Sequence, residues 1–317
     1  MEVHYSGILR PSACGEGNVF SHIWLPETTP RAIIQIAHGM QEHAGRYSRL
    51  ACRLAECGWA VLANDHIGHG RSSMGHMGTF SLKKGGFTYL LSDMHSLFSK
   101  ARQDFPGVPC ALFGHSMGSI AAGLYAAWYG DEDLLLLMGT PAPNALAGVG
   151  SLLAGLIAWK RGSTAQSSFI SRLADANTGA GSSRDPLIRN AWLTRDEEEI
   201  RRAIADPFFG KPFSASAYRE LFRALRAFGS RTWASEVKDE PILLVAGEAD
   251  PCGRYGAGPK TYYDRLCKSG HTDVTLKLYE GARHELLHEL NHEEVESLLI
   301  AFLSDKFAGL PKIARRQ

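Results

Sequence analysis

Four apolar runs in the first half of the chain each end in glycine, proline or polar residues. They are RAIIQIAHG (31–39), WAVLANDHIGHG (59–70), CALFGHSMG (110–118) and DLLLLMGTP (133–141). Continuous apolar runs of this length are typical of strands that are buried on both faces, as in a parallel sheet. Helix-like segments lie between them, for example 47–57 and 88–104. This alternation predicts a doubly wound α/β sheet with mostly parallel strands.

The strand–helix alternation stops after Pro143. Helical, charged and Gly/Ser-rich stretches follow, such as LTRDEEEIRRAIADP, before strand patterns resume at 240–250 and 273–281 and an amphipathic helix at 293–306. We therefore expect a first core part, a helical cap and a second core part, over residues 1–143, 144–236 and 237–317. A cap inserted here would cover the carboxyl edge of the sheet, where open α/β sheets bind ligands.

One serine lies in a setting that favours nucleophilic chemistry. The stretch FGHSMGS places Ser116 between Gly114 and Gly118, after an apolar run and before the helix-like SIAAGLYAAWYG. A G-x-S-x-G turn between a strand and a helix is the nucleophile elbow, in which the serine oxygen projects above the sheet. The motif alone is common, and a tight turn without chemistry is the alternative reading. The strand before it and the helix after it make the elbow the better interpretation.

A nucleophilic serine needs a base, and the base needs an acid to orient it. On this fold the expected chain order is serine, acid, histidine. Asp250 follows the strand-like ILLVAGEAD, and His284 follows TLKLYEGAR, so both stand where a predicted strand ends. Glu248 is a rival for the acid, but strand alternation would point its side chain elsewhere. We predict Ser116, Asp250 and His284 as catalytic residues.

The same region carries a competing motif, because residues 284–288 read H-E-L-L-H. In zinc proteases H-E-x-x-H lies on one continuous helix and a third ligand follows further along the chain. Gly281 shortly before His284 places that histidine in a loop or at a helix start, and the next glutamates follow too closely. We expect His288 to be an ordinary helix-face residue. No metal and no organic cofactor are expected, since DHIGHGRSSMGH (65–76) matches neither metal-ligand nor dinucleotide spacing.

Ester hydrolysis by this chemistry also needs two backbone N–H groups that stabilise the oxyanion. Met117, directly after the proposed nucleophile, should supply one of them. The loop AHGMQEH (37–43) should supply the other, with Met40 as the best candidate and His38 and Gly39 shaping the turn. His38 could act as a base instead, but a hydrogen-bonded structural histidine is the more common role.

Five stretches in order along the chain resemble one family: HGMQEHAGRY, DHIGHGRS, GHSMGS, GEADPCG and YEGARHELLHE. They are similar to the monoacylglycerol lipase and lysophospholipase group of α/β-hydrolases. The resemblance implies an α/β-hydrolase fold, the triad and oxyanion donors given above, and a small-molecule acyl ester as substrate. Four residues are expected to contact that substrate: His38, Gly39, Gln41 and His115. One departure is Gln41, which stands where the family usually has a small residue, commonly glycine.

Composition limits the kinds of partner and the cellular location that we expect for this chain. The chain has 317 residues, 44% of them hydrophobic and 21% charged, with a net charge of +1. This balance gives no reason to expect a nucleic-acid partner. Six cysteines without a dense framework, and a start without the basic and apolar parts of a signal peptide, predict a cytoplasmic protein. Residues 144–159 are apolar but short for a membrane span, so only transient contact with a lipid surface is expected there.

Other functions share this scaffold and triad. A small-molecule carboxylesterase or thioesterase is the main alternative, and an aminopeptidase or a non-catalytic ligand-binding protein are further ones. Apolar stretches in the insertion, LLAGLIAW, DPFFG and FRALRAF, are compatible with a tunnel for an acyl chain. They are equally compatible with a cap that packs on itself.

Overall fold

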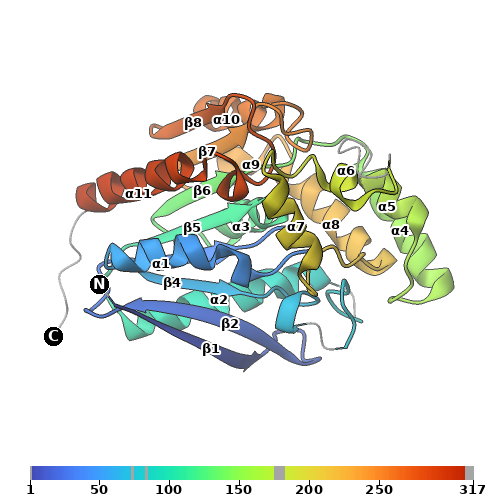
Figure 1. Ribbon diagram of the computed structural model, residues 1–317, viewed down its shortest axis with the longest axis horizontal. Helices are drawn as coiled ribbons and strands as arrows, with labels where there is room; N and C mark the ends of the chain where they lie inside the picture. The colour runs from blue at the N-terminus through green and yellow to red at the C-terminus, as the bar shows by residue number, and fades with distance from the viewer. Residues whose placement is uncertain (1, 73–74, 83–84, 175–182, 311–317) are drawn as a thin grey trace.

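The computed structural model describes residues 2–72, 75–82, 85–174 and 183–310 and is built around one eight-stranded sheet (Figure 1). Its strands are β1 (Val3–Pro11), β2 (Asn18–Pro26), β3 (Ile33–Ala37), β4 (Ala60–Asn64), β5 (Cys110–His115), β6 (Leu134–Met138), β7 (Ile242–Gly247) and β8 (Val274–Tyr279). The spatial order is β1-β2-β4-β3-β5-β6-β7-β8. All pairs from β4 onward are parallel, which confirms the predicted doubly wound α/β sheet.

The first two strands were not predicted. β1 and β2 form an antiparallel hairpin, and β2 then pairs antiparallel with β4. β1 is mostly exposed and lies at the edge of the sheet, so it lacks the continuous apolar run that marks the inner strands. The pattern that reveals a strand buried on both faces therefore has no counterpart here.

Helices cover both faces of the sheet (Figure 1). α1 (Ser48–Glu56) and α11 (His292–Gly309) pack on one face. α2 (Gly86–Asp104), α3 (Met117–Trp128), α9 (Trp233–Glu236) and α10 (Ala257–Lys268) pack on the other. Short 3-10 turns η1 (Ala44–Tyr47), η2 (Gly70–Ser72) and η3 (Leu286–His288) complete the connections. The predicted C-terminal helix at 293–306 is confirmed as part of α11.

The segment between β6 and β7 supplies a group of helices at one end of the molecule (Figure 1). They are α4 (Ala147–Arg161), α5 (Ser168–Ala174), α6 (Pro186–Asn190), α7 (Glu197–Ala205) and α8 (Ala215–Phe228). Local sequence explains where several begin: the Asp196 side chain accepts the N–H groups of Glu198 and Glu199 and so caps α7. We call α4–α8 and their connections the cap, while the proposed limits 144–236 stay a prediction.

The cap is fixed to the core mainly through α8, which packs on α3. Glycine is required at this crossing, because a Cβ on Gly123 would lie 2.2 Å from Cε2 of Phe228. In the described part of the chain no helix is long and apolar enough to cross a bilayer. The cytoplasmic location stays a prediction.

Candidate active site

Ser116 occupies the sharp turn between β5, which ends at His115, and α3, which starts at Met117. Its φ of 55° and ψ of −118° are strained for a residue with a side chain. The turn is close-packed: a Cβ on Gly118 would lie 1.9 Å from the carbonyl oxygen of Ala37, and one on Gly114 would lie 2.1 Å from Gly118 O. Only glycines fit at both places, as the elbow interpretation requires.

A chain of hydrogen bonds joins the three residues predicted as a triad. His284 Nε2 lies 2.8 Å from Ser116 Oγ, and His284 Nδ1 lies 3.0 Å from Asp250 Oδ2. Because a carboxylate can only accept, Nδ1 carries the proton and Nε2 is left to accept from the serine hydroxyl. Asp250 is fully buried, and its other oxygen accepts the N–H of Cys252 at 2.8 Å. This geometry can activate a serine nucleophile.

The pKa of His284 is raised above its ordinary value of 6.5. Burial lowers it, but the charge of Asp250 and the hydrogen bond to that carboxylate raise it by more. The imidazole is therefore a stronger base than a free histidine. It becomes protonated, and so unable to accept the Ser116 proton, as pH falls through this raised pKa.

The loop with Met40 lies opposite the elbow. Both the N–H and the carbonyl of Gly39, just before Met40, are hydrogen-bonded. Glu42 Oε1 accepts the N–H of Gly39 at 2.5 Å, and Nδ1 of His38 donates to the Gly39 carbonyl at 2.8 Å. In a trans peptide the C=O and the next N–H point in opposite directions. Fixing the Gly39 carbonyl against His38 therefore orients the N–H of Met40.

Neither the N–H of Met40 nor that of Met117 donates to another group of the described residues. Met117 is the first residue of α3, where helix N–H groups have no partner within the helix and the helix dipole is positive. Both residues line the same cavity as Ser116. Two such amides are suited to stabilise a developing oxyanion.

Gln41 has a φ of 60°, in the left-handed region that favours glycine. This agrees with its position in the sequence, where the resembling family commonly has glycine. The carbonyl oxygen of Gln41 accepts the N–H of Gly210, from the cap, at 2.8 Å. Cap and oxyanion loop are therefore connected directly.

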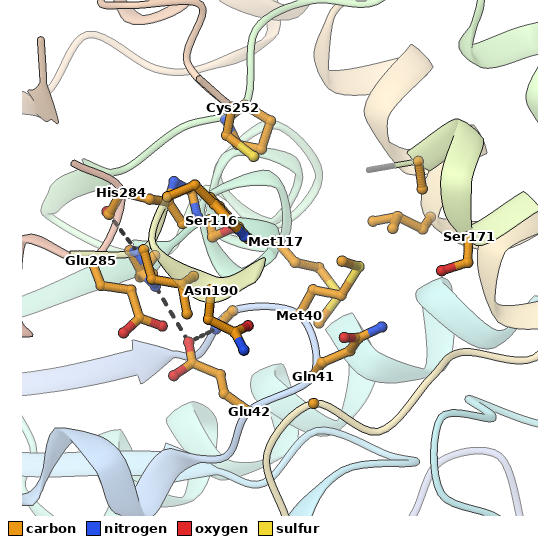
Figure 2. Close-up of a pocket in the computed structure, with 18 of the residues that line it drawn as sticks. Met40, Gln41, Glu42, Ser116, Met117, Ser171, Asn190, Cys252, His284 and Glu285 are labelled. Carbon is orange, nitrogen blue, oxygen red and sulfur yellow. Dashed lines mark hydrogen bonds and ion pairs between the residues drawn. The ribbon is translucent and has the colours of Figure 1, made fainter. Parts of the chain in front are cut away.

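The cavity above Ser116 has a volume of about 810 Å³ and lies between the core loops and the cap (Figure 2). It is large enough for a lipid-sized ligand. Gly39, Gln41 and His115 line it, as expected for substrate contacts. His38 does not: it is fully buried behind the loop, where Nε2 accepts the N–H of His66. We therefore do not propose His38 as a substrate contact.

The sequence did not reveal a buried ionic cluster beside the cavity. Arg46 contacts Glu42 at 2.8 Å and Glu285 at 2.7 Å, and all three side chains are buried. Glu42 also accepts from Tyr47 and lies 3.3 Å from His115. Glu42 and Glu285 line the cavity, and both are labelled in Figure 2. No sequence signal pairs these residues, because Arg46 and Glu285 come from opposite ends of the chain.

The residues of the H-E-x-x-H motif do not share a helix. His284 lies in a loop, whereas His288 ends the short turn η3 and pairs with Glu199 of the cap at 3.0 Å. Asp250 and His284 of the predicted triad and the neighbouring Cys252 each offer one potential ligand atom, and these three atoms lie within 4.8 Å of one another. Both ring nitrogens of His284 and both Asp250 side-chain oxygens are already hydrogen-bonded, an arrangement that suits the activation of a serine.

Comparison with known proteins agrees with this site. The family described as Serine aminopeptidase, S33, matches residues 28–291. A monoacylglycerol lipase of Mycolicibacterium smegmatis is 32% identical, over 89% of this chain and 92% of its own.

The chain belongs to the family described as Serine aminopeptidase, S33.

Human monoglyceride lipase is 30% identical over 86% of this chain and 81% of its own. A carboxyl esterase from Bacillus coagulans, whose crystal structure contains glycerol, is 29% identical in sequence. The match covers 96% of this chain and 99% of the esterase chain, with a TM-score of 0.87. The resemblance to the monoacylglycerol lipase group and the α/β-hydrolase fold are thereby confirmed. The protein is a serine hydrolase of carboxylic esters.

Proposed function

We propose that the protein hydrolyses monoacylglycerols, or lysophospholipid-type esters of the same acyl chemistry, through an acyl-enzyme. The hydrogen-bonded chain from Asp250 through His284 to Ser116, at the cavity floor, carries this proposal. Apolar cap residues line the cavity and suit an acyl chain: Ile204, Phe209, Leu221, Phe222 and Leu225. The names of the relatives, monoacylglycerol lipase and monoglyceride lipase, support the same substrate class.

In the proposed mechanism Ser116 Oγ attacks the ester carbonyl while His284 Nε2 takes the hydroxyl proton. Asp250 holds the ring and stabilises the imidazolium, and the amides of Met40 and Met117 bind the oxyanion. Collapse breaks the carbon–oxygen bond, and His284 gives its proton to the leaving alcohol. A water molecule, deprotonated by His284, then attacks the acyl-enzyme and releases the acid. These steps need only side chains, backbone amides and water.

The first test is the hydrolysis rate over a chain-length series of monoacylglycerols and matching methyl esters. Ser116→Ala should lower kcat by about 10⁴-fold or more while the far-UV circular dichroism stays unchanged. A serine-dependent optimum at medium or long chains, with glycerol esters preferred, is expected. Activity confined to short simple esters would make the protein a small-molecule carboxylesterase, and an active Ser116→Ala enzyme would refute the assigned nucleophile.

The family description raises aminopeptidase activity as a second candidate. Such an enzyme needs a carboxylate that is available to hold the free α-amine of a peptide. Glu42 and Glu285 line the cavity, but Arg46 is hydrogen-bonded to both. This pairing favours esters, so amino-acid anilides should react at least about a hundredfold more slowly than acylglycerols at equal concentration. Comparable rates would favour the aminopeptidase.

We also propose that α4 contacts lipid surfaces. Val149, Leu152, Leu156 and Trp159 follow helical spacing on one face, and Leu152 and Trp159 are 75% and 79% exposed. Lys160 and Arg161 at the end of the helix add positive charge beside this apolar face. A helix with an apolar face and cationic end groups is suited to lie on a bilayer containing anionic lipids.

Co-sedimentation with vesicles of phosphatidylcholine and phosphatidylglycerol tests this contact. The wild-type protein should bind, and the double variant Leu152→Ser, Trp159→Ser should lose most of the binding while it hydrolyses a soluble short ester at the normal rate. Equal binding of the two proteins would rule out α4 as the contact surface.

A further inference from the structure

The imidazole of His284 lies close to two other rings. The indole of Trp192, from the connection between α6 and α7, has its centroid 4.9 Å away at an interplanar angle of 40°. The ring of His115 lies 5.0 Å away at 49°. Trp192 is half-buried and lines the cavity, so the cap brings an indole ring, tilted by 40°, directly to the proposed base.

We propose that Trp192 is a positioning residue for the reaction: its indole holds the ring of His284 and stabilises the imidazolium that forms when His284 takes the proton of Ser116. The inference rests on the proposed function, because it needs His284 as the base. An indole attracts a cation near its face more strongly than the other aromatic side chains do, at centroid distances up to about 6 Å. At pH values above the pKa of His284 the stabilised charge exists only during the reaction, so there the interaction is stronger in the transition state than in the ground state.

The position of Trp192 is fixed by the residues that follow it. The carbonyl of Leu193 accepts the N–H of Glu285 at 2.7 Å. Thr194 Oγ1 donates to the carbonyl of His288 at 2.8 Å, and its own carbonyl accepts from Arg283 at 3.1 Å. The cap segment is therefore bonded to the same loop that carries His284. These hydrogen bonds hold the segment that carries the indole beside the loop that carries the imidazole.

Other groups around His284 set its charge balance, and the test must leave them in place. Asp250, Glu285 and Glu42 favour the imidazolium, and Arg46 opposes them because it pairs with both glutamates. The remaining neighbours are the Ser116 hydroxyl at Nε2, the Cys252 thiol near Asp250, and His115, whose Nε2 lies 3.3 Å from the His284 carbonyl. None of these side chains changes in a Trp192 variant.

The experiment measures kcat and KM against pH on a soluble short-chain ester, for wild type, Trp192→Phe and Trp192→Leu. Removing the indole should lower the plateau kcat by about two- to tenfold, with Trp192→Phe between wild type and Trp192→Leu. The acid limb should move to lower pH in the same order, because the pKa of His284 falls when its cation is less stabilised. KM should change less than kcat.

Shape and electronic character are separated by replacing Trp192 alone with 5-fluoro- and then 5,6,7-trifluorotryptophan. These residues keep the indole outline but weaken the negative potential of its face. The plateau kcat and the acid-limb position should fall stepwise with fluorination. Trp128→Leu, at the exposed end of α3, is the matched control and should leave the pH profile unchanged.

A loss of kcat in Trp192→Leu without any shift of the acid limb, or fluorinated proteins identical to wild type, would overturn the inference and leave only a space-filling role. A wild-type profile in every Trp192 variant, with Ser116→Ala inactive, would overturn it while the proposed function stands. Full activity of Ser116→Ala would remove both.

Discussion

Backbone strain is concentrated beside the reacting atoms. Among the described residues other than glycine, four have a positive φ: Gln41, Ser116, Arg254 and Tyr255. The first two line the cavity, and each is held by contacts that a flexible loop would lack. Ser116 is wedged between β5 and α3, and Gln41 is bonded to the cap through Gly210. The energy stored there, about 1–3 kcal/mol per residue, keeps the serine and the oxyanion loop in one geometry.

Gln41 gives a direct test of this strain. Gln41→Gly should change the free energy of unfolding by less than about 0.5 kcal/mol, because relief of the left-handed strain offsets the greater flexibility of glycine in the unfolded chain. Gln41→Val should destabilise by more than about 1 kcal/mol and lower kcat, since a β-branched residue resists this φ and would displace the loop that carries Met40. Urea unfolding and steady-state kinetics check both variants. A loss of 1 kcal/mol or more in Gln41→Gly would show that the side chain stabilises the loop.

Single residues differ in how far the sequence predicts them. Ser116, Asp250 and His284 could be proposed because each follows a strand and the three keep the required chain order. Their catalytic roles stay predictions until the variants are measured. Trp192 could not be found, because its contact with His284 depends on how a cap connection folds back onto a loop 92 residues later. Periodicity carries no information about such contacts.

At the scale of elements, the packing of α8 on α3 decides where the cap sits. Gly123 in α3 leaves room for the ring of Phe228, and Trp233 donates its indole N–H to the Gly123 carbonyl at 2.8 Å. Phe228 is completely buried against Trp233 and Tyr262. One missing side chain thus allows helices from the core and the cap to share an aromatic cluster.

Gly123→Ala should destabilise the protein by about 1–3 kcal/mol, because the new methyl group would overlap Phe228 and force the cluster apart. Thermal unfolding, followed by circular dichroism, measures the effect. The matched control is Gly148→Ala in α4, where a Cβ would lie 3.7 Å from its nearest neighbour. Alanine also has a higher helix propensity than glycine. That variant should be neutral or stabilised by up to about 1 kcal/mol. A wild-type Tm for Gly123→Ala would mean that the helices adjust freely.

The inner strands could be predicted from the sequence, but the β1–β2 hairpin could not, because only the inner strands are buried on both faces. A strand buried on both faces must be apolar throughout, as LLLLM in β6 is, and its ends are marked by glycine or polar residues. β1 has a mostly exposed pattern and gains its structure from pairing with β2. Likewise the H-E-L-L-H letters have helical spacing, but the chain forms only the short turn η3 there.

On the scale of the whole molecule, the edge of the sheet opposite the predicted catalytic residues contains two buried acids. Glu132 and Glu240 precede the neighbouring parallel strands β6 and β7, and both are almost fully buried. Burial and the neighbouring carboxyl of Glu132 raise the pKa of Glu240 to about 9, although Lys238 lies 3.3 Å away. The pKa of Glu132 is also raised, chiefly by burial.

This pair predicts how stability depends on pH. A carboxyl whose pKa is higher in the folded state keeps a proton that the unfolded chain releases. Stability should therefore fall as pH rises from about 4.5, the ordinary value, to about 9, the value for Glu240. Glu240→Gln removes the part of this dependence that belongs to Glu240 and should stabilise the protein by about 1–3 kcal/mol at pH 8.5, with a gain that disappears near pH 5.

Tm measured from pH 5 to 9 in wild type, Glu240→Gln and the exposed control Glu236→Gln checks this expectation. The control should follow wild type. An equal Tm difference between Glu240→Gln and wild type at all pH values would contradict a proton held by the buried pair.

The insertion of the cap between β6 and β7 also sets the time at which a newly made chain gains activity. The proposed base His284 follows the proposed nucleophile Ser116 by 168 residues and reaches it only when β7 and β8 have joined the sheet. At ordinary rates of translation this interval is roughly 10–30 s. A ribosome-bound fragment that already displays the serine elbow is therefore inert, and ester cleavage in a translation reaction reports the arrival of the last two strands rather than the synthesis of the serine.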